Sequence, residues 1–213
     1  MFSADDDIAP TRVKICGITH PDDMRGVIAA GADAIGLVFH DPSPRCVSIE
    51  QARQLARLAG PFVTVVGLFV DAPVVFLQQV LAQVPLQLLQ FHGTESRSYC
   101  EQFNRPYIKA LRMKPELDVA AAVAEFDSAA GILLDAYRPG TAGGTGETFD
   151  WRRVPWQAPC PIVLAGGLNP ENVKRAIAAT RPYGVDVSSG VESAPGRKDL
   201  HRVAQFIDHA KIA

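Results

Sequence analysis

Short apolar runs alternate with amphipathic segments along almost the whole chain. Eight of these runs are rich in β-branched and other aliphatic residues, and their centres lie roughly 21 to 30 residues apart, a spacing typical of repeated strand–helix units. Most of them are apolar throughout rather than alternating, as in parallel strands that are buried on both faces. The pattern therefore predicts eight strands, over 13–18, 34–39, 62–70, 86–91, 107–111, 131–136, 161–166 and 184–189.

Helical periodicity fills several of the intervals between the predicted strands. IEQARQLARLA (49–59) places its apolar residues on one helical face, and KDLHRVAQFIDHAK (198–211) does the same at the end of the chain. In NPENVKRAIAA (169–179), an asparagine cap followed by proline is a helix start signal. The interval 149–158 is short and contains Trp and Pro, and it gives the weakest helical pattern.

Eight strand–helix units in a row, without a break in composition, predict one domain of the α/β class. A closed TIM (β/α)8 barrel fits this number, whereas a doubly wound sheet usually has fewer units. We expect the barrel domain to span residues 13–213 and residues 1–12 to form an N-terminal extension. At 213 residues the chain is shorter than the roughly 250 typical of this barrel, so additions to the fold must be small.

Charge and cysteine content exclude several classes of function. The formal net charge of −2 and the pI near 6.2 indicate neither a nucleic-acid-binding protein nor one that binds membrane surfaces. No apolar run approaches the ~20 residues of a membrane span, and the acidic N-terminus has no signal-peptide pattern. The cysteines are far apart and show no metal-ligand spacing. These features predict a reduced cytoplasmic protein without a metal site.

Two glycine-flanked segments near the end of the chain predict an anion site. VLAGGLNPENV (163–173) and GVDVSSGVES (184–193) each run from an apolar strand through small residues into a predicted helix start. Backbone N–H groups at such a point are open to an anion, and the helix dipole favours negative charge there. Because the loops after strands 7 and 8 of a (β/α)8 barrel often form a phosphate site, we expect a phosphorylated small-molecule substrate.

Cys16 and Asp135 stand at the ends of the first and sixth predicted strands, where the active site of such a barrel lies. We expect Cys16 to act as a base or nucleophile, with Lys14 nearby to favour the thiolate; the alternative is a buried structural thiol. Partial removal from water would favour the protonated form of Asp135, which suits a general acid; the alternative is a residue that turns the chain into a loop. A substrate between the two would meet one acid and one base.

Other polar residues near strand ends carry weaker predictions. Arg45, on a proline-rich loop, can bind a carboxylate through both arms of its guanidinium. Gln90 and His92 end strand 4 and are expected to be hydrogen-bonded supporting groups. The glycine-rich segment 138–149 is predicted to be a lid that closes over the substrate. Its central residues are Gly143, Gly144, Thr145 and Gly146. No nucleotide- or dinucleotide-binding pattern is present, so no cofactor is expected.

Seven segments spread over the chain resemble the phosphoribosylanthranilate isomerase family of tryptophan biosynthesis. They are, in order, VKICGIT, GLVFHDPSPRCVS, VGLFV, LQLLQFHG, ILLDAYRPGTAGGTGETFDW, VLAGGLNPENV and GVDVSSGVES, so the likeness runs over roughly residues 13 to 211. KICGIT and DVSSGVE are the most specific pieces. The resemblance implies an Amadori rearrangement of N-(5-phosphoribosyl)anthranilate to 1-(o-carboxyphenylamino)-1-deoxyribulose 5-phosphate, without a cofactor.

The same resemblance implies roles for individual residues. Asp135 falls on the acid that protonates the furanose ring oxygen, and Cys16 falls on the base that removes the C2′ proton. Arg45 falls on the arginine that holds the anthranilate carboxylate. Asp186 looks like a buried polar residue near the site, and no role follows for His40, Asp41 or Cys46. The residues that match the phosphate-binding loops are Gly166, Gly167, Ser188, Ser189 and Gly190.

The sequence leaves two other functions open. One is another phosphate-binding barrel enzyme of tryptophan or histidine biosynthesis. An indole-forming synthase is expected to carry lysine and glutamates at strand ends. A histidine-pathway isomerase is expected to carry two aspartates, one of them at strand 1, and to show a duplicated half-barrel. The other is a non-catalytic barrel that only binds a phosphorylated ligand, and the presence of both Cys16 and Asp135 argues against it. No long apolar patch marks a subunit interface, so we expect a monomer, with a dimer as the alternative.

Overall fold

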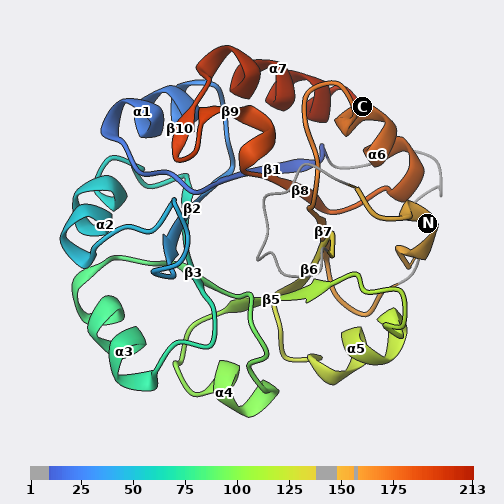
Figure 1. The fold of residues 1–213 in the computed structure, drawn as a ribbon, viewed down its shortest axis with the longest axis horizontal. Coiled ribbons are helices and arrows are strands. Elements are labelled where there is room, and N and C mark those ends of the chain that lie inside the picture. The colour runs from blue at the N-terminus through green and yellow to red at the C-terminus, as the bar shows by residue number, and fades with distance from the viewer. Residues whose placement is uncertain (1–9, 138–147, 156–157) are drawn as a thin grey trace, which may run out of the picture.

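Eight parallel strands close into a barrel in a computed structural model of the chain, which describes residues 10–137, 148–155 and 158–213. The strands follow chain order around the barrel, and β1 pairs with both β2 and β8 to close it. Figure 1 looks down the barrel, with the strands in an inner ring and the helices in an outer one. The predicted TIM (β/α)8 barrel is confirmed.

Each predicted apolar run forms a strand, although most strands are slightly shorter than the run. The strands are β1 (Arg12–Cys16), β2 (Ala34–Phe39), β3 (Thr64–Phe69), β4 (Leu88–Phe91), β5 (Tyr107–Arg112), β6 (Gly131–Asp135), β7 (Ile162–Leu164) and β8 (Gly184–Val187). Because β1 starts at Arg12, the barrel begins one residue before the predicted boundary. Cys16 and Asp135 are the last residues of their strands, as expected for residues that face an active site.

Helices cover the outside of the barrel after most strands. They are α1 (Pro21–Ala29), α2 (Ile49–Ala56), α3 (Val74–Gln83), α4 (Arg97–Glu101), α5 (Val119–Glu125), α6 (Val173–Thr180) and α7 (Leu200–Lys211). After β6, the described residues 148–155 contain a single turn of 3-10 helix, η1 (Trp151–Arg153), in agreement with the weak helical pattern there. After β8 come a second such turn, η2 (Ser189–Val191), and an unpredicted antiparallel pair, β9 (Glu192–Ala194) and β10 (Arg197–Lys198).

Two predicted helix starts are wrong by a few residues. α6 does not start at Asn169, because this residue closes a separate turn: its side chain accepts hydrogen bonds from the backbone N–H groups of Glu171 and Asn172, each 3.0 Å long. α7 does not include Lys198, because Asp199 caps the helix by accepting from the backbone N–H groups of the next residues. Lys198 therefore belongs to β10, and its Nζ donates a hydrogen bond to the backbone oxygen of Cys16 at the end of β1.

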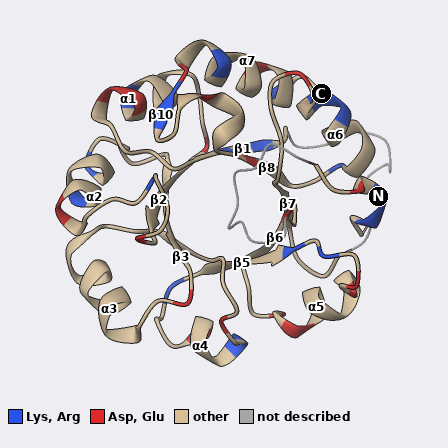
Figure 2. Cartoon of the chain, in the orientation of Figure 1, with Lys and Arg blue, Asp and Glu red and all other residues tan. Residues whose placement is uncertain are grey.

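Side chains alternate between the two faces of each barrel strand, and this alternation places the chemistry inside. In β1, Val13 and Ile15 pack outward into the main hydrophobic core beneath the helices, so Lys14 and Cys16 face the interior. Figure 2 shows charged residues spread over the outer helices and loops, whereas the ribbon of most strands is tan. A smaller apolar cluster fills part of the interior: Ile108, Ala110, Leu133, Val163 and Ala165.

The four cysteines form no disulfide with one another. They are Cys16, Cys46, Cys100 and Cys160, and Cys16 and Cys100 are buried. In the parts of the chain that the structure describes, no helix combines the length and the apolar character that crossing a bilayer requires.

Candidate active site

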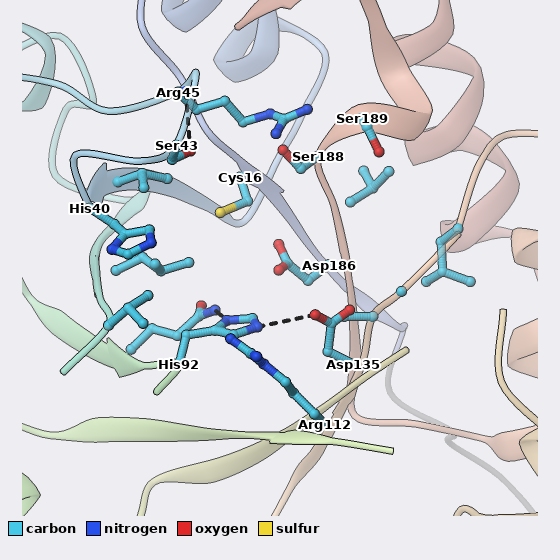
Figure 3. A pocket seen from close by; sticks show the side chains of 18 of the residues that line it. Cys16, His40, Ser43, Arg45, His92, Arg112, Asp135, Asp186, Ser188 and Ser189 are labelled. Carbon is cyan, nitrogen blue, oxygen red and sulfur yellow. Dashed lines mark hydrogen bonds and ion pairs between the residues drawn. The ribbon is translucent and has the colours of Figure 1, made fainter. Parts of the chain in front are cut away.

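A pocket opens at the carboxyl ends of the barrel strands, and every strand or the loop that follows it contributes to its wall. Figure 3 shows Cys16 and Asp135 on different sides of this pocket, with Ser188 and Ser189 along a third. Among the predicted site residues that the structure describes, most line the pocket, and two lie behind its wall, Lys14 and Gly190. Gly143, Gly144, Thr145 and Gly146 of the predicted lid lie outside the described residues.

Cys16 lies beside a buried ion pair. Nζ of Lys14 is 2.9 Å from Oδ1 of Asp186, and both side chains are almost fully buried. Although burial alone would lower it, the pKa of Lys14 is raised by the nearby carboxylate and thiol, so the ammonium is kept. Burial raises the pKa of Cys16, and the positive charges of Lys14 and Lys198 oppose this rise without cancelling it. Lys14 thus acts in the direction that favours the thiolate, but burial has the larger effect on the pKa of Cys16.

A glycine on the neighbouring strand gives Cys16 its space. Gly36 of β2 pairs with Cys16 of β1, and a Cβ atom at Gly36 would lie 2.7 Å from Sγ of Cys16 and 3.2 Å from Nζ of Lys14. The first of these distances is shorter than real Cβ contacts, so a larger residue would force the thiol to move. The small residue therefore keeps the thiol and the ammonium on the interior face of β1.

Asp135 is part of a chain of polar groups at the opposite side of the pocket. Its Oδ2 is 3.1 Å from Nε2 of His92, and Nδ1 of His92 is 3.0 Å from the side-chain nitrogen of Gln90 (Figure 3). If the amide of Gln90 donates to Nδ1, the imidazole carries its proton on Nε2 and donates it to Asp135. Oδ1 of Asp135 then remains available to the pocket. Gln90 and His92 thus form a series of hydrogen-bond contacts that ends at the carboxyl group of Asp135.

The loops after β7 and β8 pack against each other at one side of the pocket. Gly166 has a φ of +80°, and a Cβ atom there would overlap the backbone of Ala136, so only glycine fits. A Cβ atom at Gly190 would overlap the carbonyl oxygen of Leu168. The hydroxyl of Ser188 is buried, faces the pocket and has no hydrogen-bond partner among the described residues. A buried hydroxyl without a partner is suited to a ligand that accepts hydrogen bonds.

Arg45 lines the pocket, but its guanidinium is already engaged. Nε and Nη2 lie 2.8 and 2.6 Å from the two carboxylate oxygens of Glu192, a bidentate pair that is mostly buried. Hydrogen bonding to Glu192 raises the pKa of Arg45 despite its burial. The prediction that this arginine lies in the site agrees with its position, but the pairing means that a substrate carboxylate would reach only the remaining N–H groups.

Three charged residues of the site were not predicted from the sequence. Arg112 ends β5 and points into the pocket near His92 and Asp135 (Figure 3), and its side chain pairs with no other described residue. Glu192 and Lys198 come from the β9–β10 pair that folds over the end of β1. A polar residue closing the apolar run YIKAL was a usable signal for Arg112. Neither Glu192 nor Lys198 follows a barrel strand, so the strand pattern could not single them out.

The loop after β2 contains further polar residues, none of which has a role predicted from the sequence. His40 lines the pocket from the loop after β2, and Ser43 of the same loop accepts a hydrogen bond from the backbone N–H of Arg45. Sγ of Cys46 is 3.6 Å from Oδ1 of Asp41, at the outer side of this loop. In the described parts of the chain, no group of three or more His, Cys, Asp or Glu side chains is arranged to hold a metal ion.

Comparisons with known proteins agree on one family. The chain matches the family model described as "PRAI: N-(5'phosphoribosyl)anthranilate (PRA) isomerase" over residues 13–209. It is 67% identical over 195 residues to the N-(5'-phosphoribosyl)anthranilate isomerase of Cellvibrio japonicus, which covers 92% of this chain and 91% of that protein. The protein of the same name from Thiobacillus denitrificans is 52% identical over 202 residues, with coverage of 95% and 98%.

Solved structures of this family also superpose on the barrel. Phosphoribosyl anthranilate isomerase from Thermotoga maritima has a TM-score of 0.87 and 40% identity, covering 95% of this chain and 100% of that one. A structure of such an isomerase in complex with reduced 1-(o-carboxyphenylamino)-1-deoxyribulose 5-phosphate has a TM-score of 0.81 and 38% identity, with the same coverage. These matches favour the isomerase over the other barrel enzymes considered from the sequence. The chain belongs to the N-(5'-phosphoribosyl)anthranilate isomerase family, the aldose–ketose isomerases of tryptophan biosynthesis.

Proposed function

We propose that this chain performs the Amadori rearrangement of N-(5-phosphoribosyl)anthranilate with Asp135 as general acid and Cys16 as general base. The observation that carries this assignment is that both residues line one pocket together with the two glycine-rich loops. A ribose phosphate held at those loops would place its sugar ring between the acid and the base. One acid and one base suffice, because the reaction moves only protons and the electron pairs that follow them.

The first step opens the sugar ring. Asp135 donates a proton to the ring oxygen, the bond between this oxygen and C1′ breaks, and the anthranilate nitrogen supplies the electron pair that forms the Schiff base. His92 holds Oδ2 of Asp135 at 3.1 Å, so Oδ1 is the oxygen that faces the substrate. Fixing the carboxyl group in this way lowers the entropy lost when the acid meets the ring oxygen.

The second step moves hydrogen from C2′. Cys16 removes the C2′ proton as a thiolate, which gives an enolamine that tautomerises to the ketone. Burial raises the pKa of Cys16, so most of this group carries its proton near neutral pH. The positive charges of Lys14 and Lys198 oppose the effect of burial and thus favour the thiolate. Because the fraction of thiolate grows with pH, the base-dependent step is expected to accelerate as pH rises.

The anions of the substrate are bound at two further places. Backbone N–H groups of Gly166, Gly167 and Ser189, with the unpartnered hydroxyl of Ser188, are suited to the phosphate. The carboxylate of the anthranilate would meet Arg45, as the resemblance implies, and Arg112 offers a second guanidinium. The lid predicted from the sequence, with Gly143, Gly144, Thr145 and Gly146 at its centre, lies outside the described residues and remains part of this proposal.

Steady-state turnover of freshly prepared N-(5-phosphoribosyl)anthranilate tests the assignment. Cys16→Ala and Asp135→Ala should each lower kcat by about 10²- to 10⁴-fold, the usual contribution of a positioned acid or base. Circular dichroism and the Tm should stay close to those of the wild-type protein. Turnover of Cys16→Ala at the wild-type rate would show that the base is another group. Restoration of growth to a tryptophan-requiring strain that lacks the isomerase tests the activity as a whole.

The remaining expectations concern domains, assembly and location. We propose that the barrel from Arg12 through α7 is the catalytic domain, and that the enzyme works in the cytoplasm as a monomer. The support for a monomer is that the large exposed apolar side chains of the described residues are scattered, with Phe62, Val75 and Ile212 the most exposed. One relative is called a dimeric enzyme from Thermotoga maritima. Light scattering after size exclusion distinguishes the two states.

A further inference from the structure

A lysine outside the barrel strands contacts the backbone of Cys16, the proposed general base. Lys198 lies on β10, and its side chain is fully buried with its Nζ against the end of β1. Its Nζ donates hydrogen bonds to the backbone oxygen of Cys16 at 2.7 Å, to the backbone oxygen of Ser188 at 3.2 Å, and to Oε1 of Glu192 at 2.8 Å. All three N–H groups of the ammonium are therefore used.

The glutamate that Lys198 contacts carries the connection further. Oε1 of Glu192 accepts from both Lys198 and Nε of Arg45, and Oε2 accepts from Nη2 of Arg45. The pairs are mostly buried, with 5% of the Glu192 side chain and 15% of that of Arg45 exposed. An unbroken series of contacts thus joins the strand end that holds Cys16, the loop that holds Ser188, and the arginine of the pocket wall.

We propose that Lys198 is a positioning residue for the isomerisation, because its single ammonium fixes the base, the phosphate loop and Arg45 relative to one another. This inference rests on the roles assigned above to Cys16 and Ser188. Lys198 touches no atom that reacts, so it acts through the backbone of Cys16 and Ser188 and through Glu192. A displacement of the base by about 1 Å can slow a reaction about 100-fold. A residue that fixes the backbone of Cys16 can therefore have a large effect on kcat.

The energetics of Lys198 fit a functional rather than a stabilising role. Burial lowers the pKa of Lys198 even though Glu192 acts to raise it. A lysine whose pKa is lower in the folded state than in the unfolded one binds its proton less well after folding, so the charged form opposes folding at neutral pH. Apolar residues in place of the whole buried group of charges would avoid this penalty. The chain nevertheless has a charged group where it can reach Cys16 and Ser188.

The charge of Lys198 also acts on the thiol of Cys16. The charged groups that face this thiol are Lys14 on β1, Asp186 on β8, Lys198 on β10 and Arg45 on the loop after β2. Lys14 and Lys198 favour the thiolate, and Asp186 disfavours it. Removal of the Lys198 charge leaves Lys14 paired with Asp186, so the thiolate becomes harder to form. The pH at which Cys16 loses its proton is then expected to move upward.

Lys109 provides a matched control on the other side of the barrel. It too is a buried lysine, and its Nζ donates to the backbone oxygen of Gly93 at 2.7 Å and to Oε2 of Glu95 at 2.9 Å. It contacts neither Cys16 nor the loop after β8. Loss of either lysine removes a buried ammonium with a similar set of partners, so a general effect on stability is expected in both variants.

The test compares Lys198→Met, Lys198→Arg and Lys109→Met. Lys198→Met should lower kcat about 10- to 100-fold. It should also move to higher pH the limb of the kcat/KM profile that rises as Cys16 loses its proton. Lys198→Arg keeps the charge and should return that limb toward the wild-type position. Lys109→Met should lower the Tm without moving the limb. A wild-type kcat and an unmoved limb in Lys198→Met, or an equal shift in Lys109→Met, would overturn the proposal.

A second measurement does not need turnover. Alkylation of Cys16 by iodoacetamide, followed by peptide mass spectrometry across pH, reports the thiolate directly. Lys198→Gln keeps N–H donors for the two carbonyl oxygens and serves if Lys198→Met does not fold. Its Cys16 should be alkylated only at higher pH than that of the wild-type protein, and an unchanged profile would contradict the proposal. If the wild-type protein turns over no substrate, the proposed reaction fails while this measurement still tests Lys198.

Discussion

At the scale of a single residue, Gly36 leaves the space that the thiol of Cys16, the proposed base, occupies. Because a Cβ atom there would lie 2.7 Å from Sγ of Cys16, Gly36→Ala should push the thiol out of line and lower kcat about 10-fold or more. Gly67→Ala on β3 is the control, since its Cβ would meet the flexible side chain of Leu86 instead, away from the pocket. We expect that control to lower the Tm more than kcat. Equal kcat values for wild type and Gly36→Ala would contradict the argument.

Arg112 brings a second cation to the acid side of the pocket. It pairs in register with Asp135, and its guanidinium has no ion-pair partner among the residues that the structure describes. The anthranilate carboxylate lies ortho to the nitrogen on C1′, close to the bond that the acid opens, so a cation beside Asp135 is placed to hold it. Arg112→Ala should raise KM about 10-fold with a smaller change in kcat, and Arg112→Lys should recover part of the loss.

Substrate chemistry provides the control for Arg112. The N-phosphoribosyl derivative of aniline has no carboxylate, so its kcat/KM should be nearly the same for the wild-type protein and Arg112→Ala. Steady-state kinetics with both substrates separates a carboxylate contact from a general disturbance of the pocket. If Arg112→Ala impairs both substrates equally, the guanidinium does not bind the carboxylate.

At the scale of secondary structure elements, the eight barrel strands could be predicted from the sequence, whereas the short strands β9 and β10 beside the site could not. Buried parallel strands must be apolar on both faces, so a run such as GILLDA is visible in the sequence, and the residue that ends it is a candidate by position alone. β9 and β10 are only three and two residues long and carry no such run. Their role depends on contacts over a long separation, such as that between Lys198 and Cys16.

The helix start at Asn169 shows a different limit of the sequence. An asparagine followed by proline fits a helix cap, and Asn169 does accept hydrogen bonds from two backbone N–H groups. The turn that it closes is held by Asn172, whose side chain donates to the backbone oxygen of Gly167 at 2.9 Å. These contacts within the loop after β7 accompany the start of the helix at Val173 instead of Asn169. Local signals identify a turn but do not say whether a helix continues from it.

The two loops proposed to bind phosphate act as one element because they touch. Gly190, after β8, has no room for a Cβ atom against the carbonyl oxygen of Leu168, after β7. Gly190→Ala should separate the loops and raise the KM of the phosphorylated substrate about 10-fold or more. Inhibition by inorganic phosphate should weaken in parallel, which identifies the lost contact. If Gly190→Ala raises KM but is inhibited by phosphate as strongly as the wild-type protein, the substitution disturbs another part of the pocket and not the phosphate contact.

Over the whole molecule, buried ion pairs gather at the catalytic end of the barrel. Lys14 pairs with Asp186, Lys109 with Glu95, and Glu192 with both Arg45 and Lys198. Such pairs add little net stability, because desolvation of the charges opposes their attraction. Loss of one partner is nevertheless harmful, because it leaves the other charge buried alone. The stability of the protein should therefore depend on pH through the groups that also shape the site.

Glu192 allows the pH dependence of the free energy of unfolding to be measured. Burial would raise the pKa of Glu192, but its hydrogen bonds to Arg45 and Lys198 hold it below the ordinary value. A carboxyl group with a lower pKa in the folded state stabilises the fold above its unfolded pKa, about 4.3, and loses this contribution as pH falls through the folded pKa. Glu192→Gln should therefore lower the free energy of unfolding at pH 7 by about 1–3 kcal/mol. The difference from wild type should shrink below about pH 4.3.

Urea unfolding from pH 7 to pH 3 measures this difference, with Glu116→Gln as the control. Glu116 is exposed, so its replacement removes the same charge without breaking a buried pair. We expect the wild-type protein and the control to lose stability in parallel on acidification, while Glu192→Gln starts lower and falls less. A gap between Glu192→Gln and wild type that stays constant down to pH 3 would mean that Glu192 contributes by packing alone. In that case the carboxylate would not be the group that holds Arg45 and Lys198 together.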